Sequence, residues 1–280
     1  MAAITHHDCA SLVDPLSATR KEGFKKIVNM KYFVSEQSIV RKIWGKADTT
    51  LFIFAGAAAE FALNKAVDWL YFTGRLPADP LGRLFSTVTY ARQIIFSEEE
   101  EALKAIDSIT TIHQTVEANR GAKIPDWAYR DVLFLLIDYS IRSFELLDRK
   151  LTDVEKAEVF DVFYRVGERM QLAGLPTNFT EWEQMREEHL QENLICSDFT
   201  VDLYRQYKKH LGGLRYELVI QIQALLTPKT VSRLLSLKKS FWITPLLGGY
   251  KFLRHLKMEA FFRNLLLPGK YRVEIKSLDS

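Results

Sequence analysis

Residues 79–116, DPLGRLFSTVTYARQIIFSEEEEALKAIDSITTIHQTV, predict two consecutive helices around which the rest of the chain is organised. Asp79-Pro80 is typical of a helix start, because a short polar acceptor followed by proline suits the first helical turn. Ser97, followed by four glutamates, predicts the second start, with a serine cap and carboxylates near the positive end of the helix dipole. Apolar residues then recur at helical spacing along the second segment.

Three side chains on these two helices offer the best chemistry in the chain. Arg83 and Thr87 are four residues apart and therefore lie on one face of the first helix. In the second helix His113 shares a face with Leu103 and Ile106, so we expect it to point inward. A guanidinium, a hydroxyl and a buried imidazole are therefore expected on neighbouring helices. The spacing alone leaves open whether His113 is a ligand or a plain core histidine.

The composition is that of an ordinary globular protein. The 280 residues are 48% apolar and 26% charged, and the net charge of +3 gives no electrostatic case for binding nucleic acid. The two cysteines, Cys9 and Cys196, match no metal or redox motif and fit a reducing cytoplasm. The first residues form neither a basic start nor a sustained apolar run, so no secretory signal is predicted. We therefore expect a cytoplasmic protein.

The remaining segments also predict helices. Residues 126–147 are apolar nearly all round, which is typical of a central, buried helix. The small residues of 55–59 would let either a neighbouring helix or a flat ligand approach the backbone. Only 271–275 resembles a strand, and it has no partner, so the fold class is all-α: a single large multi-helix domain with a buried central helix. Further helices are expected over 20–32, 35–44, 48–72, 153–174, 180–195, 198–211, 214–226, 228–237 and 245–267. Ser35 is an expected cap, Thr152 and Glu155 match a capping box, and Gly45 and Gly121 are expected to end their helices.

We divide the chain into a flexible arm over 1–18, a helical core over 19–227 and a basic, apolar extension over 228–280 that packs on the core. In the extension lysines and arginines far outnumber acids and alternate with aromatic residues. Such a segment suits contact with an anionic membrane surface or with an acidic group of a ligand. The simpler interpretation is a solvated basic face over an aromatic core.

Several chemistries are excluded by missing patterns. Di-iron helices need Glu-x-x-His pairs, but threonine stands three residues before His113 and arginine three before His189. Closely spaced zinc ligands, a Gly-x-Ser-x-Gly elbow, a phosphate loop and a dinucleotide fingerprint are absent as well. A single inward histidine can still serve as the axial ligand of haem, because the porphyrin supplies the other four nitrogens.

From about Val40 to His210 the chain resembles the catalytic domain of the MpaB-type oxygenases and rubber oxygenases (latex clearing proteins). The resemblance is specific because its parts occur in the same order. They are the small-residue apolar helix of 51–63, the aspartate-proline, arginine and threonine motif DPLGRLFST of 79–87, the histidine segment IHQTV of 112–116, Asp138 with RSFE of 142–145, and the stretch from 151–152 to 174–176.

The resemblance implies an all-helical haem b oxygenase with His113 as the proximal iron ligand. Arg83 and Thr87 would bind near the haem and support catalysis, and a small hydrophobic substrate would react with dioxygen. A proposed catalytic carboxylate in the family lies upstream of the arginine motif, where Asp68 is the nearest candidate and Glu60 a weaker one. The resemblance implies no nucleic-acid partner.

The chain also departs from the family pattern. Leu133 replaces a second histidine, Asn64-Lys65 replaces histidine-proline, and Ser86 stands where some members have a lysine. The leading hypothesis is a cytoplasmic haem oxygenase. The basic, apolar C-terminal segment adds the expectation of a peripheral contact with the inner face of the membrane. The alternative is a non-catalytic helical module that binds an apolar ligand, haem or a membrane surface.

Overall fold

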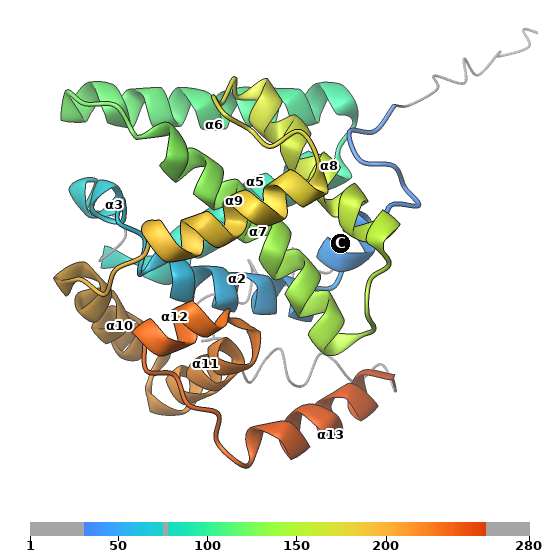
Figure 1. Ribbon diagram of the computed structural model, residues 1–280, viewed down its shortest axis with the longest axis vertical. Helices are drawn as coiled ribbons and strands as arrows, with labels where there is room; N and C mark the ends of the chain where they lie inside the picture. The colour runs from blue at the N-terminus through green and yellow to red at the C-terminus, as the bar shows by residue number, and fades with distance from the viewer. Residues whose placement is uncertain (1–30, 75–77, 256–280) are drawn as a thin grey trace, which may run out of the picture. The chain divides into compact units, whose positions relative to one another are not determined.

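The computed structural model describes residues 31–74 and 78–255, which form one helical domain (Figure 1). Within these ranges there is no β-strand, only isolated bridges between Tyr32 and Glu98 and between Asn64 and Leu194. The all-α prediction is therefore confirmed. The predicted arm, nearly all of the helix predicted over 20–32 and the strand predicted over 271–275 lie outside the described residues.

Helices α2 (Ala47–Phe61) and α7 (Asp126–Leu147) form the centre of the domain and share its largest helix–helix contact. Helices α8 (Asp153–Arg169) and α9 (Phe179–Glu192) also pack on α7, and Figure 1 shows α9 crossing in front of it. Helix α7 buries residues on every side, among them Phe134, Ile137 and Tyr139. The prediction of a central helix over 126–147 is confirmed to the residue.

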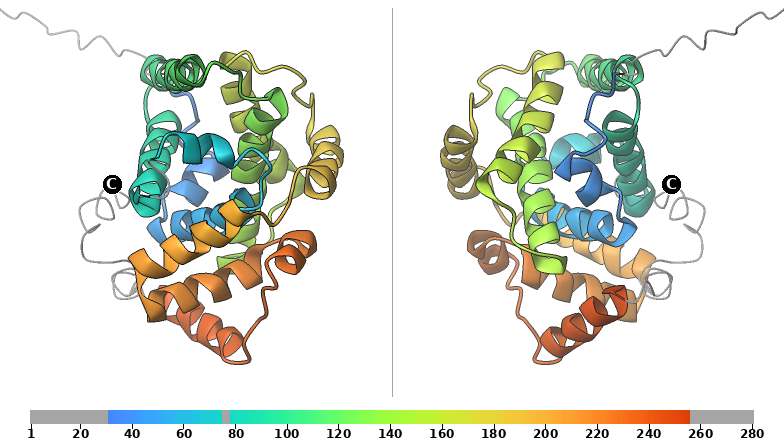
Figure 2. Two further views of the ribbon diagram at one scale, coloured as in Figure 1. Left: turned by 90° about the vertical axis from the view of Figure 1, so that its left-hand side faces the viewer. Right: turned by 90° about the vertical axis from the view of Figure 1, so that its right-hand side faces the viewer.

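The other helices surround this centre. Helix α5 packs against α6, and α11 covers part of α2 (Figure 2). The bounds are α1 (Ile39–Trp44), α3 (Asp68–Phe72), α5 (Pro80–Phe96), α6 (Glu99–Arg120), α10 (Asp198–Leu211), α11 (Gly213–Leu226), α12 (Lys229–Leu234) and α13 (Ile243–His255).

The contact between α2 and α7 depends on the small side chains of α2. A Cβ atom added at Gly56 would lie 2.3 Å from Cδ1 of Tyr139, which is fully buried. The glycine therefore lets the tyrosine ring lie directly on the α2 backbone. A neighbouring helix, rather than a flat ligand, therefore packs on this face of residues 55–59.

Replacing Gly56 with alanine is expected to destabilise the protein by about 1–3 kcal/mol, the usual cost of overpacking a core. The ring of Tyr139 cannot move away without breaking its hydrogen bond to Glu60. Urea unfolding would measure the change, with Gly213→Ala, where a Cβ meets no atom within 4 Å, as the matched control. Equal midpoints for the two variants would contradict this account.

The single helix predicted over 48–72 is wrong, because the chain turns between α2 and α3. Backbone groups of 63–65 pair with 193–195 instead of continuing the helix: Ile195 N donates to Leu63 O at 2.7 Å, and Lys65 N donates to Asn193 O at 3.0 Å. The side chain of Asn64 accepts a hydrogen bond from Ala66 N at 2.8 Å. A turn-forming asparagine thus ends the helix at the point where a second segment is available for pairing.

Helix ends were predicted with mixed success. Asp79 caps α5 by accepting from Gly82 N, Gly121 ends α6 in the left-handed conformation, and Thr152 forms the expected capping box with Glu155. Other predictions are wrong. The cap of α1 is Ser38 rather than Ser35, and Gly45 ends α1 at φ −76°, without the left-handed conformation. The N-cap of α6 is Glu98, which forms no side-chain cap bond, rather than Ser97, and α8 ends at Arg169 rather than near 174.

Helix α13 is attached to the core by ion pairs and a hydrogen bond of buried side chains. Arg254 Nε lies 2.6 Å from Asp48 Oδ2, and its Nη1 lies 2.6 Å from Asp148 Oδ2. Tyr250 donates a hydrogen bond to Asp48 at 2.6 Å. The described part of the predicted extension therefore contacts the core, while its remainder, 256–280, lies outside the described residues. None of the helices that are described is long and apolar enough to cross a membrane.

Candidate functional site

His113 lies in the second half of α6, on the face that also carries Glu117 and Arg120 at helical spacing. Its side chain is half-buried rather than fully buried as expected, because the last turns of α6 extend beyond the core and bury few residues. The ring packs edge-on against Tyr129 of α7, with 5.1 Å between ring centroids. Helices α6 and α7 thus position the imidazole between them.

The nitrogen Nδ1 of His113 is buried, and no described residue forms a hydrogen bond with it. Burial, followed by the nearby positive charge of Arg83, lowers the pKa of His113 from 6.5 to about 4. The imidazole is therefore neutral at pH 7. A neutral ring with an unsatisfied buried nitrogen is the form that metal ligation requires.

Arg83 and Thr87 lie on α5 as predicted, and several of their contacts are within the helix. Nη1 of Arg83 donates to Ser86 Oγ at 3.1 Å, and the carbonyl oxygen of Arg83 accepts from Ser86 Oγ at 2.8 Å and from Thr87 Oγ1 at 3.2 Å. The hydroxyls therefore support the helix around the guanidinium. The charge of Arg83 lowers the pKa of His113, so these two predicted site residues lie in one region.

Asp68, the predicted carboxylate, forms an ion pair with Arg120, whose Nη2 lies 2.7 Å from Asp68 Oδ2. Arg120 also lies over the Trp69 ring, 4.0 Å from its centroid. This contact joins α3 to the same face of α6 that carries His113. Asp68 is therefore placed near the end of the His113 face, with its charge neutralised by an arginine.

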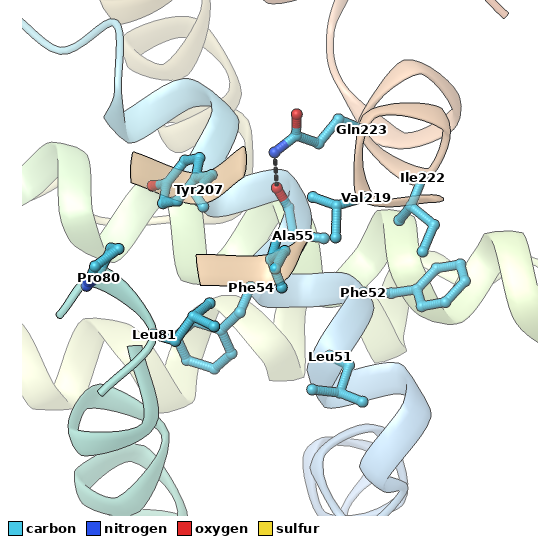
Figure 3. A pocket seen from close by; sticks show the side chains of 12 residues that line it. Leu51, Phe52, Phe54, Ala55, Pro80, Leu81, Tyr207, Val219, Ile222 and Gln223 are labelled. Carbon is cyan, nitrogen blue, oxygen red and sulfur yellow. Dashed lines mark hydrogen bonds between the residues drawn. The ribbon is translucent and has the colours of Figure 1, made fainter. Parts of the chain in front are cut away.

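An apolar cavity of about 80 Å³ lies between α2, the start of α5, α10 and α11 (Figure 3). Its polar side chain Gln223 is already satisfied, since Nε2 donates to Ala55 O at 3.1 Å and Oε1 accepts from Tyr204 at 3.0 Å. The cavity is therefore suited to apolar groups. The lining residues, none of them a predicted site residue, are Leu51, Phe52, Phe54, Ala55, Ala58, Pro80, Leu81, Tyr207, Leu211, Val219, Ile222 and Gln223.

The imidazole of His113 has the donor chemistry that haem ligation requires, but His113 does not line the apolar cavity. The cavity is smaller than the roughly 150 Å³ of an engineered apolar cavity that holds benzene, and it is too small for a porphyrin. Among the described residues no group of three or more histidine, cysteine or acidic side chains is arranged to hold a metal ion. A haem ligated by one imidazole would not need such a group, so the fit rests on His113.

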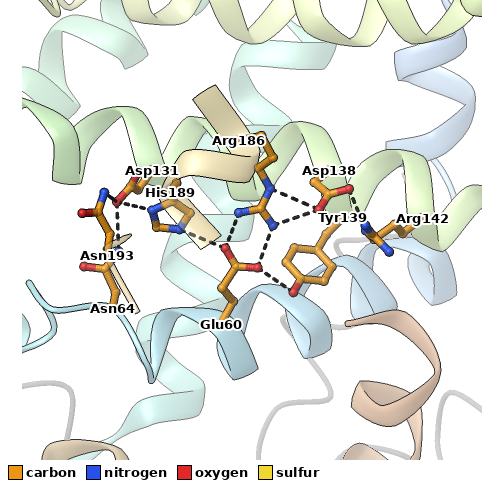
Figure 4. Close-up of polar contacts among 9 residues, drawn as sticks. All are labelled: Glu60, Asn64, Asp131, Asp138, Tyr139, Arg142, Arg186, His189 and Asn193. Carbon is orange, nitrogen blue, oxygen red and sulfur yellow. Dashed lines mark hydrogen bonds and ion pairs between the residues drawn. The ribbon is translucent and has the colours of Figure 1, made fainter. Parts of the chain in front are cut away.

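Sequence reasoning missed a buried charge cluster between α2, α7 and α9 (Figure 4). Arg186 forms ion pairs with Glu60 and with Asp138, the second at 2.8 Å from Nη2 to Oδ2. Tyr139 donates a hydrogen bond to Glu60 at 2.9 Å. The imidazole of His189 lies between two carboxylates, with Nε2 at 3.1 Å from Glu60. We call these residues, with Asp131, the Glu60 cluster.

Glu60, the weaker of the two residues considered for the family's catalytic carboxylate, is therefore already paired within the cluster. Its side chain is fully buried, and its oxygens contact Arg186, Tyr139 and His189. The sequence did carry a signal for the cluster, because Glu60 and Asp138 are single charges inside otherwise apolar runs. A buried charge requires partners, but their identity depends on tertiary contacts.

The cluster favours the charged forms of Glu60 and His189. Burial alone would raise the pKa of Glu60, but the charge and hydrogen bonds of Arg186 and His189 outweigh it and lower the pKa to about 2. Burial would lower the pKa of His189, but Asp131 and Glu60 raise it above 6.5. His189 Nδ1 lies 2.6 Å from Asp131 Oδ2, which explains the direction.

The lowered pKa of Glu60 predicts acid sensitivity. Because the folded pKa of Glu60 lies below its unfolded value of 4.5, its contribution is complete above pH 4.5 and is lost as the pH falls towards 2. The free energy of unfolding is therefore expected to fall over this window more steeply in the native protein than in Glu60→Gln. Urea unfolding from pH 6 to 2.5 measures it, with exposed Glu183→Gln as control. Equal slopes for native protein and Glu60→Gln would contradict the assignment.

Leu133 packs tightly against α8. A Cβ at Gly167 would lie 2.8 Å from Cδ1 of Leu133, which is buried.

A model of the "ER-bound oxygenase mpaB/B'/Rubber oxygenase, catalytic domain" family matches residues 41–253, which extend from α1 into α13. No curated protein and no solved structure gives a significant match. The matched range covers most of the chain, which therefore belongs to the MpaB and rubber oxygenase catalytic-domain family.

Proposed function

We propose that this member of an oxygenase family is a haem b-dependent oxygenase that oxidises or cleaves a small hydrophobic molecule with dioxygen. The observation that carries the proposal is His113, a neutral imidazole with a buried, unsatisfied nitrogen beside the charge of Arg83. Family membership supports oxygenase chemistry in general. The proposal adds to this chemistry a haem cofactor and His113 as the iron ligand.

In this proposal each residue has a stated role. His113 would hold the iron through a ring nitrogen, and the half-buried guanidinium of Arg83 would stabilise negative charge near the haem. Thr87 would keep the α5 turn around Arg83 in place through its bond to the Arg83 carbonyl. Haem b, when bound, supplies the activation of dioxygen. For Asp68 to act as a base, its ion pair with Arg120 has to open.

The apolar cavity between α2, α10 and α11 supports the substrate class. Its side chains are almost all apolar, and the amide of Gln223 is satisfied within the protein. An apolar group entering it would displace no well-bound polar contact. The small volume indicates that only part of a substrate, or a small molecule, would fit without movement of α10 or α11.

The first test is an absorption spectrum of the full-length protein expressed with a haem precursor, before and after dithionite. The expected result is an intense band at the blue edge of the visible range that shifts on reduction, with about one haem per chain. Oxygen consumption with a panel of apolar substrates would follow. A featureless spectrum together with no iron by elemental analysis would refute the oxygenase proposal.

The second candidate is a non-catalytic module that binds an apolar ligand, haem or a membrane surface. It is favoured by one observation: the apolar cavity and the predicted site residues do not coincide. This candidate expects a protein without a haem band, or one that keeps haem but consumes no oxygen. An apolar fluorescent probe would then bind to the cavity, and Ala58→Phe, which fills it, would weaken that binding. The cytoplasmic location stays a prediction in either case.

A further inference from the structure

The connection between α12 and α13, together with the outer face of α13, exposes large apolar side chains. Phe241 is 93% exposed, Phe252 is 66% exposed and Leu246 is 41% exposed. Scattered exposed apolar residues are ordinary, but three on one short helix and its leading loop form a group. The views in Figures 1 and 2 place α13 at the outer edge of the described helices.

The charged side chains of this segment are of one sign. From Pro228 to His255 the sequence contains six lysines and arginines and no aspartate or glutamate. Lys238 and Lys239 are exposed and come directly before Ser240 and Phe241. The most exposed aromatic side chain therefore follows a pair of solvated lysines. We call Lys238, Lys239, Phe241, Leu246 and Phe252 the α13 surface.

The α13 surface is held in a fixed orientation by the opposite face of the helix. Ile243, Tyr250 and Arg254 are spaced by seven and four residues, and all three are buried. Arg254 Nη2 donates to Thr49 at 3.0 Å, in addition to its ion pairs with Asp48 and Asp148. The inward face is therefore anchored by charge and packing, and the outward face cannot turn to bury its aromatic side chains.

We propose that the α13 surface docks on an anionic lipid bilayer, with Phe241 and Phe252 entering the interface and the lysines contacting lipid phosphates. Charge complementarity favours this occupant, because lysines beside exposed aromatic and aliphatic residues are the composition of interfacial membrane anchors. The docking does not depend on haem. It would bring a domain that has no described membrane-spanning helix to the place where hydrophobic molecules dissolve.

The test is co-sedimentation of the full-length protein with vesicles of phosphatidylcholine alone or with 30% phosphatidylserine. We expect binding to the anionic vesicles that is at least about tenfold stronger than to neutral ones and that weakens between 50 and 500 mM salt, because salt screens the lysines. Equal binding to both vesicles, or no binding to either, would overturn the proposal.

Two variants locate the contact. Lys238→Glu/Lys239→Glu and Phe241→Ser/Phe252→Ser are each expected to lower binding at least about tenfold. The matched controls are Lys208→Glu/Lys209→Glu, an exposed lysine pair on α10, and Val154→Ser, an exposed apolar residue on α8; both are expected to bind as the native protein does. Equal losses in variants and controls would refute the α13 surface. So would a dimer, seen by light scattering, that disappears with Phe241→Ser, because the face would then join two copies.

Discussion

A His113→Gly variant is expected to lose the haem band, with haem affinity lowered by more than about 100-fold. Loss of a group that merely orients a metal ligand costs 10–100-fold, and loss of the only protein ligand costs more. His113 is the proposed ligand because its buried Nδ1 has no partner among the described residues and its ring is neutral at pH 7. Haem titration followed by absorbance would measure the affinity of both proteins.

Imidazole in solution gives this experiment a second readout. The glycine variant leaves space at the ring position, so added imidazole is expected to restore the band in part. His210→Ala, which removes a histidine from the end of α10, should keep the native spectrum. If His113→Gly still binds one haem per chain without imidazole, the ligand assignment is wrong, whatever the activity of the protein. Circular dichroism would show that the variant is folded.

Replacing Arg186 with methionine is expected to destabilise the protein by about 3–5 kcal/mol, the cost of leaving buried charges without their partner. This is a large share of the roughly 5–15 kcal/mol that stabilises a typical domain. The Arg186 side chain is 5% exposed and forms ion pairs with Glu60 and Asp138. Without it, the fully buried Glu60 would keep only Tyr139 and His189 as partners. Urea unfolding at pH 7 would measure the loss.

Two further variants separate the charge from its packing. Arg142→Met removes an arginine that contacts the same Asp138 but is 40% exposed, so the expected loss is below about 1 kcal/mol. Glu60→Gln/Arg186→Met removes both charges of the Glu60–Arg186 pair and is expected to be more stable than Arg186→Met alone. If the double variant loses the sum of the two single losses, the residues do not interact and the role given to the Glu60 cluster fails.

Much of the helical architecture could be predicted from local patterns. The central helix over 126–147 was apolar nearly all round, and the structure buries it at those bounds. Helix ends were predicted where the capping residue acts within its own turn, as Asp79 and Thr152 do. The prediction failed over 48–72, because α2 ends where its backbone pairs with residues about 130 positions later.

The candidate site shows the same division. Arg83 and Thr87 share a helix face because their spacing requires it, and the order of motifs along the chain indicated the oxygenase family that the match to 41–253 shows. The depth of His113 depended on how far α6 extends past its neighbours, which helical periodicity does not contain. The pairing of Asp68 with Arg120 likewise joins two helices distant in sequence.

The sequence by itself determined the all-α class, the central helix, most helix starts and the family, because these depend on local hydrogen bonding, periodic burial and motif order. Only the tertiary structure decided the partners of Glu60, the half-burial of His113 and the separation between the cavity and the predicted site. The physical reason is that burial and ion pairing are set by which distant helices meet. Charged groups such as Glu60 and Arg186 reveal their partners only once the helices are packed.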